Sequence, residues 1–230
     1  MLFARTACAI GAQALVAAVF ALRSSPTPWH DAEPWLPVYG TLIDAGCLAL
    51  LWRLTRSEGI RLVDLVGFDR QRLGHDVLLG LALIPASVLF ILGGTSSMGW
   101  LLYGTSTPPY PFGALPLPAA LYGVLVFPFV WGLTEQMTYN GYLLPRFQVL
   151  GSTSLAIVCV AFAWSAQHAF MPLTFDPKFM VFRALSPVPF SSFITLVYLR
   201  FRRLVPFVIA HAFMDCASVL IGVLLPVLRG

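Results

Sequence analysis

The sequence is poor in charge. Only 10% of its 230 residues are Asp, Glu, Lys or Arg, whereas soluble globular domains carry about 25%. Hydrophobic residues make up 58% of the chain, too many for a soluble domain of this length. The composition therefore predicts an all-α polytopic membrane protein, with residues 1–230 forming a single integral membrane domain.

Cysteine and lysine are also scarce. The four cysteines are scattered singly through apolar runs with no C-x-x-C pair, so neither a disulfide framework nor a thiolate metal site is indicated. The net charge of +4 comes almost entirely from arginine, because Lys178 is the single lysine. A basic balance could indicate nucleic-acid binding, but these arginines gather in short loops beside apolar runs. Membrane topology explains them better, and no nucleic-acid partner is expected.

Seven apolar runs are long enough to be membrane spans. We expect them at about 2–22, 36–52, 77–94, 119–144, 153–172, 187–199 and 204–228. The first run begins like a signal peptide, but it has no convincing small-x-small cleavage site. We therefore expect it to be retained as the first span.

The connecting segments indicate an orientation. Residues 53–72 predict a short amphipathic piece at the membrane surface, and the uncharged, Gly- and Pro-containing stretch 95–118 predicts an outer loop or re-entrant element. Pro145-Arg146 is expected to end the fourth span. With the N-terminus in the cytoplasm, the arginine-rich loops all lie inside, as the positive-inside rule requires. We expect an integral protein of the plasma membrane.

The fourth span carries the polar cluster Glu135, Gln136 and Asn140 within W-G-L-T-E-Q-M-T-Y-N-G. A carboxyl group in hydrocarbon is costly, so Glu135 marks a functional site by default. Gln136 and Asn140 are four residues apart and share a helix face, while Glu135 points to a neighbouring face with Tyr139.

Two later spans each supply a histidine. His168 ends W-S-A-Q-H, where Trp164 shares its face, and His211 begins H-A-F-M-D, where Asp215 shares its face. A single histidine in an apolar helix is more often structural than catalytic. Two histidines together with two acids, spread over three spans, favour an enzyme.

These three blocks, in this order, resemble the family of CAAX prenyl proteases and bacteriocin-processing intramembrane proteins. The family pattern is E-E-x-x-x-R, then aromatic-x-x-x-H, then H-x-x-x-N/D, and the resemblance covers about 119–220. Gln136 and Asn140 stand where the pattern has Glu and Arg. We interpret them as a coupled replacement of an ion pair by two amides that hydrogen-bond each other in support of the site.

The resemblance implies an intramembrane endopeptidase that needs no cofactor. It assigns Glu135 and His168 to activation of a water molecule, and His211 with Asp215 to the oxyanion side. A buried glutamate suits a general base, and a second polar group must stabilise the developing oxyanion. The implied partners are the lipid bilayer and a peptide or protein substrate that enters from the membrane or the cytoplasmic side.

Two other functions stay open. Glu, two His and Asp could ligate zinc, although the H-E-x-x-H spacing of many zinc proteases is missing. A catalytically silent binding or immunity-type membrane protein would explain the altered E-Q…N motif. Asp44 has no motif around it, and we expect it to be an interior hydrogen-bonding residue.

Overall fold

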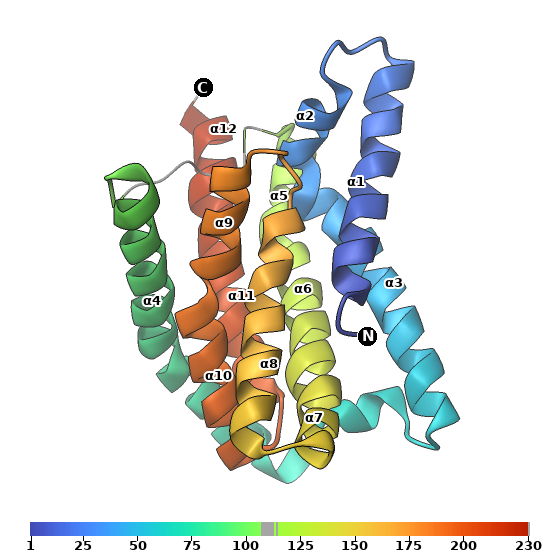
Figure 1. The fold of residues 1–230 in the computed structure, drawn as a ribbon, viewed down its shortest axis with the longest axis vertical. Helices are drawn as coiled ribbons and strands as arrows, with labels where there is room; N and C mark the ends of the chain where they lie inside the picture. The colour runs from blue at the N-terminus through green and yellow to red at the C-terminus, as the bar shows by residue number, and fades with distance from the viewer. Residues whose placement is uncertain (107–112, 114, 230) are drawn as a thin grey trace.

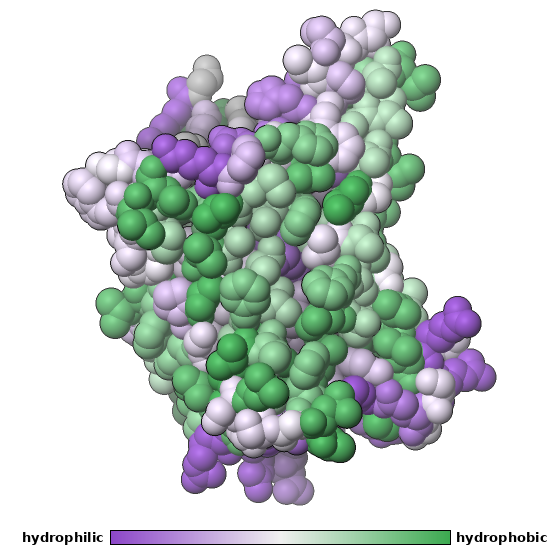
Figure 2. Space-filling view, in the orientation of Figure 1, coloured by the Kyte–Doolittle hydropathy of each residue, from purple (hydrophilic) through white to green (hydrophobic). Residues whose placement is uncertain are grey.

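The computed structural model describes residues 1–106, 113 and 115–229, which form a bundle of helices (Figure 1). The described part of the chain contains no strand, so the prediction of an all-α fold is confirmed. Six helical segments are long and apolar enough to cross a membrane, and a bent pair of helices brings the number to seven. The space-filling view shows apolar side chains over most of the visible face, with hydrophilic residues gathered mainly at the two ends (Figure 2).

The first half of the chain forms α1 (Ala4–Leu22), α2 (Pro28–Ala32), α3 (Leu36–Ser57) and α4 (Leu73–Tyr103). Between α3 and α4 the chain makes two short 3₁₀ turns, Leu62–Val66 and Arg70–Arg72, in the segment where an amphipathic piece was expected. Whether these turns lie at the membrane surface stays a prediction.

The third span is longer than the sequence indicated. Helix α4 continues through residues 95–103, so the expectation of a loop there was wrong. Gly94, just before this stretch, lies so close to the carbonyl oxygen of Ser186 that any side chain there would clash with it. The helix ends where Gly104 adopts φ +69°, a conformation that favours glycine. Residues 107–112 and 114, in the remainder of that expected loop, lie outside the described residues.

The fourth span is a broken helix. It consists of α5 (Leu117–Leu125), α6 (Phe127–Gln136), a π-helix over Met137–Leu143 and α7 (Leu144–Leu150), with a 40° bend between α5 and α6. The expectation that it stops at Pro145-Arg146 was wrong. Pro145 lies in the first turn of α7, directly after the π-helix, a position where proline is tolerated.

The last part of the chain contains α8 (Thr153–Ala166), a 3₁₀ turn (Gln167–Phe170), α9 (Pro177–Leu185), α10 (Val188–Phe201), α11 (Val205–Val219), a π-helix (Leu220–Leu224) and α12 (Leu225–Arg229). The sixth span was placed too late, because α9 and α10 together run from Pro177 to Phe201. The carboxylate of Asp176 accepts hydrogen bonds from the backbone N–H groups of Lys178 and Phe179, so this charged stretch starts a helix rather than a loop.

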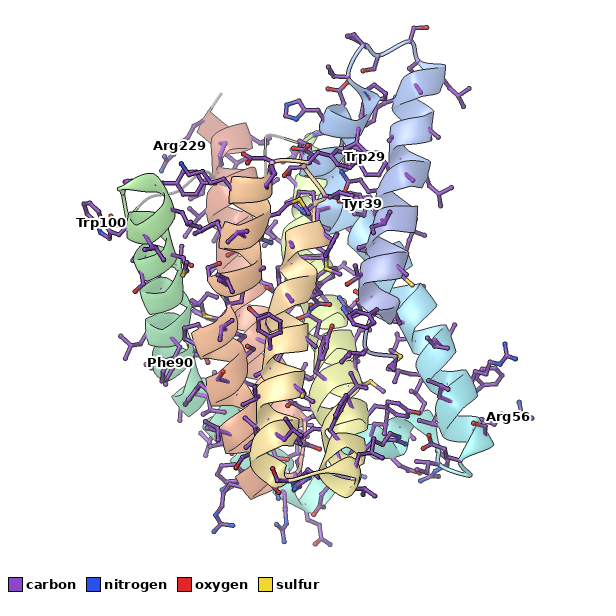
Figure 3. All side chains as sticks on the ribbon, viewed as in Figure 1. Trp29, Tyr39, Arg56, Phe90, Trp100 and Arg229 are labelled. Atoms are coloured by element: carbon purple, nitrogen blue, oxygen red, sulfur yellow. The ribbon has the colours of Figure 1, made fainter. Side chains whose placement is uncertain are left out.

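The arginine-rich segments meet at one end of the bundle. Arg146, in α7, is paired with Glu58 after α3, and Arg202 after α10 donates to Gln148. The N–H of Leu204 donates to the carbonyl of Val66, which joins the start of α11 to the turns before α4. Arg56 lies toward this end, whereas Trp29 and Arg229 lie toward the opposite end (Figure 3).

Candidate active site

Glu135 lies in the last turn of α6 and is completely buried. Its carboxylate accepts two short hydrogen bonds from the second motif, one from Trp164 Nε1 at 2.6 Å and one from Gln167 Nε2 at 2.6 Å. The Trp164 ring also packs against Tyr139 at 5.8 Å between centroids. Trp164 and Tyr139, both expected beside the site, are therefore part of its wall.

The third motif meets Glu135 through α11. His211 Nε2 lies 3.6 Å from Glu135 Oε2 and 3.5 Å from Asp215 Oδ2. The expected contact between His211 and Asp215, one helical turn apart, is thus confirmed. Glu135, His211 and Asp215 form one group, in which a single imidazole nitrogen faces two carboxyl groups.

The neutral pair expected at Gln136 and Asn140 is present. Asn140 Nδ2 donates to Gln136 Oε1 at 2.8 Å, and Gln136 Nε2 lies 3.5 Å from His211 Nδ1. Because the oxygen of the Gln136 amide accepts from Asn140, the NH₂ group of Gln136 faces the imidazole ring of His211. An N–H donor at Nδ1 favours the tautomer with the proton on Nε2, directed at the two carboxyl groups.

His168 lies in the 3₁₀ turn that follows α8 and is half-buried. Its Nδ1 donates to the carbonyl oxygens of Trp164, at 3.2 Å, and Ser165, at 3.1 Å, which leaves Nε2 as the acceptor nitrogen. Among the described contacts, Gln167 rather than His168 bonds the Glu135 carboxylate. The change from α to 3₁₀ geometry at Gln167 alters which side chain faces α6. The role of His168 in activating water stays a prediction.

The structure adds two charged residues that the sequence analysis did not place in the site. Arg5 of α1 donates from Nη1 to Asp44 Oδ1 at 2.7 Å, and its Nη2 lies 3.5 Å from Glu135 Oε1. Both Arg5 and Asp44 are buried. The available signal was two isolated charges of opposite sign inside apolar spans, which pair when buried. Asp44 is indeed an interior hydrogen-bonding residue, as expected.

Over the part of the chain that the structure describes, no group of three or more His, Cys, Asp or Glu is arranged to hold a metal ion. The cluster instead suits proton transfer. It offers two carboxyl groups and an imidazole in contact, enclosed by the Trp164 and Phe190 rings, whose centroids each lie 5.5 Å from that of His211.

Comparison with known families found one match, in the second half of the chain. Residues 117–217 match the family model described as type II CAAX prenyl endopeptidase Rce1-like. No curated protein and no solved structure matched the chain. The matched range includes Glu135, His168, His211 and Asp215 and leaves out Arg5 and Asp44. It agrees with the range of about 119–220 expected from the three motifs, and over these residues the chain is similar to the Rce1-like family of CAAX prenyl endopeptidases.

Proposed function

We propose that this chain, which resembles a membrane protease family over residues 117–217, is a glutamic-type intramembrane endopeptidase that works without a metal ion. One observation supports this more than any other. The carboxylate of Glu135 is fully buried and is contacted from both other motif segments, by Trp164 and Gln167 on one side and by His211 on the other. Side chains with little reason to meet in an apolar bundle surround one carboxyl group, as expected for a functional site.

In the proposed reaction, Glu135 acts as general base toward a water molecule that His168 helps to hold. The water oxygen attacks the peptide carbonyl carbon while its proton passes to Glu135. The Nε2–H of His211 donates to the oxyanion that develops on the carbonyl oxygen. Collapse of this intermediate breaks the C–N bond, and the proton held by Glu135 goes to the leaving amine.

Asp215 supports His211 in this scheme. An ionised carboxylate cannot donate to an oxyanion, but it can accept from the imidazole and hold the ring in place. Asp215 Oδ2 lies 3.5 Å from His211 Nε2, so the Nε2–H can point at Asp215 before the substrate binds and turn to the oxyanion as it develops. His211 is then the donor to the oxyanion, and Asp215 orients it.

The family description makes a prenylated C-terminal peptide the first substrate to try, with a library of unmodified peptides beside it. We further propose that residues 1–230 act as one domain in the plasma membrane with the arginine-rich end in the cytoplasm. Reporter fusions or labelling of single cysteines at the loops would test this orientation.

Cleavage by detergent-purified protein tests the assignment. We expect Glu135→Gln and His168→Ala each to abolish cleavage while the protein stays folded and membrane-inserted. Glu58→Gln is the matched control, because Glu58 lies after α3 beside Tyr142 and Arg146, away from the Glu135 cluster, and should cleave like wild type. Wild-type turnover by Glu135→Gln or by His168→Ala would overturn the assignment.

Two other functions give different results in the same assay. A zinc protease would lose activity with a chelator and regain it with zinc. A catalytically silent binding protein, which the replacement of Glu and Arg by Gln136 and Asn140 favours, would bind peptides without cleaving them. We expect neither result, because Glu135, His168 and His211 are all retained.

A further inference from the structure

The guanidinium of Arg5 is completely buried in the middle of the bundle. It belongs to α1, far from the family-matched residues 117–217 in sequence. Arg5 lies in the first turn of α1, and the start of this helix lies away from both ends of the bundle (Figure 1). A buried cation at this depth requires partners, and the partners identify its role.

Three nitrogens of the guanidinium face three different side chains. Nη1 donates to Asp44 Oδ1 at 2.7 Å, Nε donates to Gln167 Oε1 at 3.2 Å, and Nη2 lies 3.5 Å from Glu135 Oε1. The guanidinium carbon also lies 4.4 Å from the centroid of the Trp131 ring, within cation–π range. Only a planar group with separate donors can serve all of these partners from one position.

Arg5 also acts on Glu135 indirectly, through Gln167. The amide oxygen of Gln167 accepts from Arg5 Nε and from the hydroxyl of Tyr139, the latter at 2.9 Å. With its oxygen held by two donors, the amide must present its NH₂ group on the other side, where it donates to Glu135 Oε1 at 2.6 Å.

The charges around Glu135 give independent support. The family pattern E-E-x-x-x-R has a second carboxylate and an arginine on the same helix as the first glutamate. This chain has the neutral Gln136 and Asn140 at those two positions. Arg5 and Asp44 restore one cation and one additional carboxylate beside Glu135, from α1 and α3.

We propose that Arg5 is a positioning residue for Glu135, with Asp44 holding the guanidinium in place. Arg5 attracts the carboxylate electrostatically from Nη2, 3.5 Å away, and orients the Gln167 amide that donates to it. The N-terminal helix thereby completes the site that residues 117–217 carry. This inference rests on the proposed function, because it takes Glu135 to be the general base.

A variant that tests the role of Arg5 must remove the guanidinium without leaving Asp44 as a buried, unpaired carboxylate. Arg5→Gln combined with Asp44→Asn replaces the buried ion pair by two amides and takes the guanidinium away from Glu135. Gln13→Ala is the matched control on α1. Gln13 is equally buried, but it bonds Leu173, near the opposite end of the bundle from the basic loops, and does not touch Glu135.

We expect the double variant to lower kcat about 100-fold, the scale found when a catalytic group is misplaced by about 1 Å, with KM within about threefold of wild type. KM should hold because Arg5 acts through Glu135 and not on the substrate. Gln13→Ala should lower the melting temperature and leave kcat within about twofold. Arg5→Lys keeps the positive charge but loses the planar set of N–H donors of the guanidinium, and we expect a kcat between those of the double variant and wild type.

A double variant that is folded and has the kcat of wild type would overturn the inference. If the double variant does not fold, Arg5→Lys decides: a kcat below wild type with KM unchanged supports the role, and a wild-type kcat refutes it. Failure of the proposed function gives a different pattern, in which Glu135→Ala cleaves as well as wild type. Loss of cleavage in Glu135→Ala with full activity in the double variant rejects the role of Arg5 alone.

Discussion

The hydrogen bond between Asn140 and Gln136 allows a quantitative test of the coupled replacement. In Gln136→Glu, the new carboxylate would be fully buried beside Glu135, and the oxygen that replaces Nε2 would face His211 Nδ1 in place of an N–H group. An uncompensated buried charge costs about 3–5 kcal/mol. For a protein of this size that corresponds to a fall in melting temperature of roughly 6–20 °C.

Asn140→Arg should cost a similar amount alone, for the same reason. In the double variant the two charges share a helix face at the separation where Asn140 now donates to Gln136 at 2.8 Å, so they can pair. The longer arginine must still fit a fully buried position, which costs about 1–3 kcal/mol through overpacking. We therefore expect the double variant to be more stable than either single variant, although less stable than wild type.

Thermal unfolding in detergent of the wild type, both single variants and the double variant forms a complete cycle. Close charge pairs give coupling energies of about 1.5–7 kcal/mol, so we expect a favourable coupling of at least about 2 kcal/mol. Simple additivity between positions 136 and 140 would show that the new side chains do not pair, and the interpretation as a coupled replacement would be wrong.

Three further predictions concern the pH dependence and packing. Asp215→Asn replaces the carboxylate 3.5 Å from His211 Nε2 by a neutral amide, which stabilises a protonated His211 less, so activity should fall away at lower pH than in wild type; identical alkaline limbs of the two pH–rate profiles would contradict this. Hydrogen bonds from Arg146 and Tyr142 lower the pKa of Glu58 below its ordinary value of 4.5. The ionised Glu58 therefore contributes to the free energy of unfolding, by at most about 1 kcal/mol at this exposed site. This contribution is complete above pH 4.5 and is lost as the pH falls through the lowered pKa. Melts of Glu58→Gln and wild type should therefore differ at pH 7 and converge in acid, and a gap that persists in acid would refute this. Gly94→Ala should destabilise by about 1–3 kcal/mol because its Cβ would clash with the backbone carbonyl oxygen of Ser186, whereas Gly93→Ala, which meets nothing within 4 Å, should be nearly neutral; equal melting temperatures would refute the close approach.

Several features of this protein follow from the sequence alone. The scarcity of charge determines a membrane bundle, because each apolar run must be helical to satisfy its backbone in lipid. Helical periodicity places Gln136 beside Asn140 and His211 beside Asp215, and the structure has both contacts. Such contacts within one helix are fixed by spacing, so they need no knowledge of the tertiary fold.

Helix ends depended on contacts between elements. The continuation of α4 through residues 95–103 and of the fourth span through Pro145 could not be predicted from composition, which weighs glycine and proline as helix breakers. Close packing against Ser186 uses the missing side chain of Gly94 inside α4, and the π-helix Met137–Leu143 leads into α7, whose first turn holds Pro145. Neither feature leaves a periodic signal in the sequence.

Only the tertiary structure decided which residues surround Glu135. The motifs named His168, but the 3₁₀ turn at the end of α8 presents Gln167 to the carboxylate. Arg5 and Asp44 lie more than ninety residues before Glu135, and nothing in their local sequence connects them to it. They meet because α1 packs against α3 and against the 3₁₀ turn Gln167–Phe170, and α3 packs against α6. In this low-dielectric interior, opposite charges are stable only in contact.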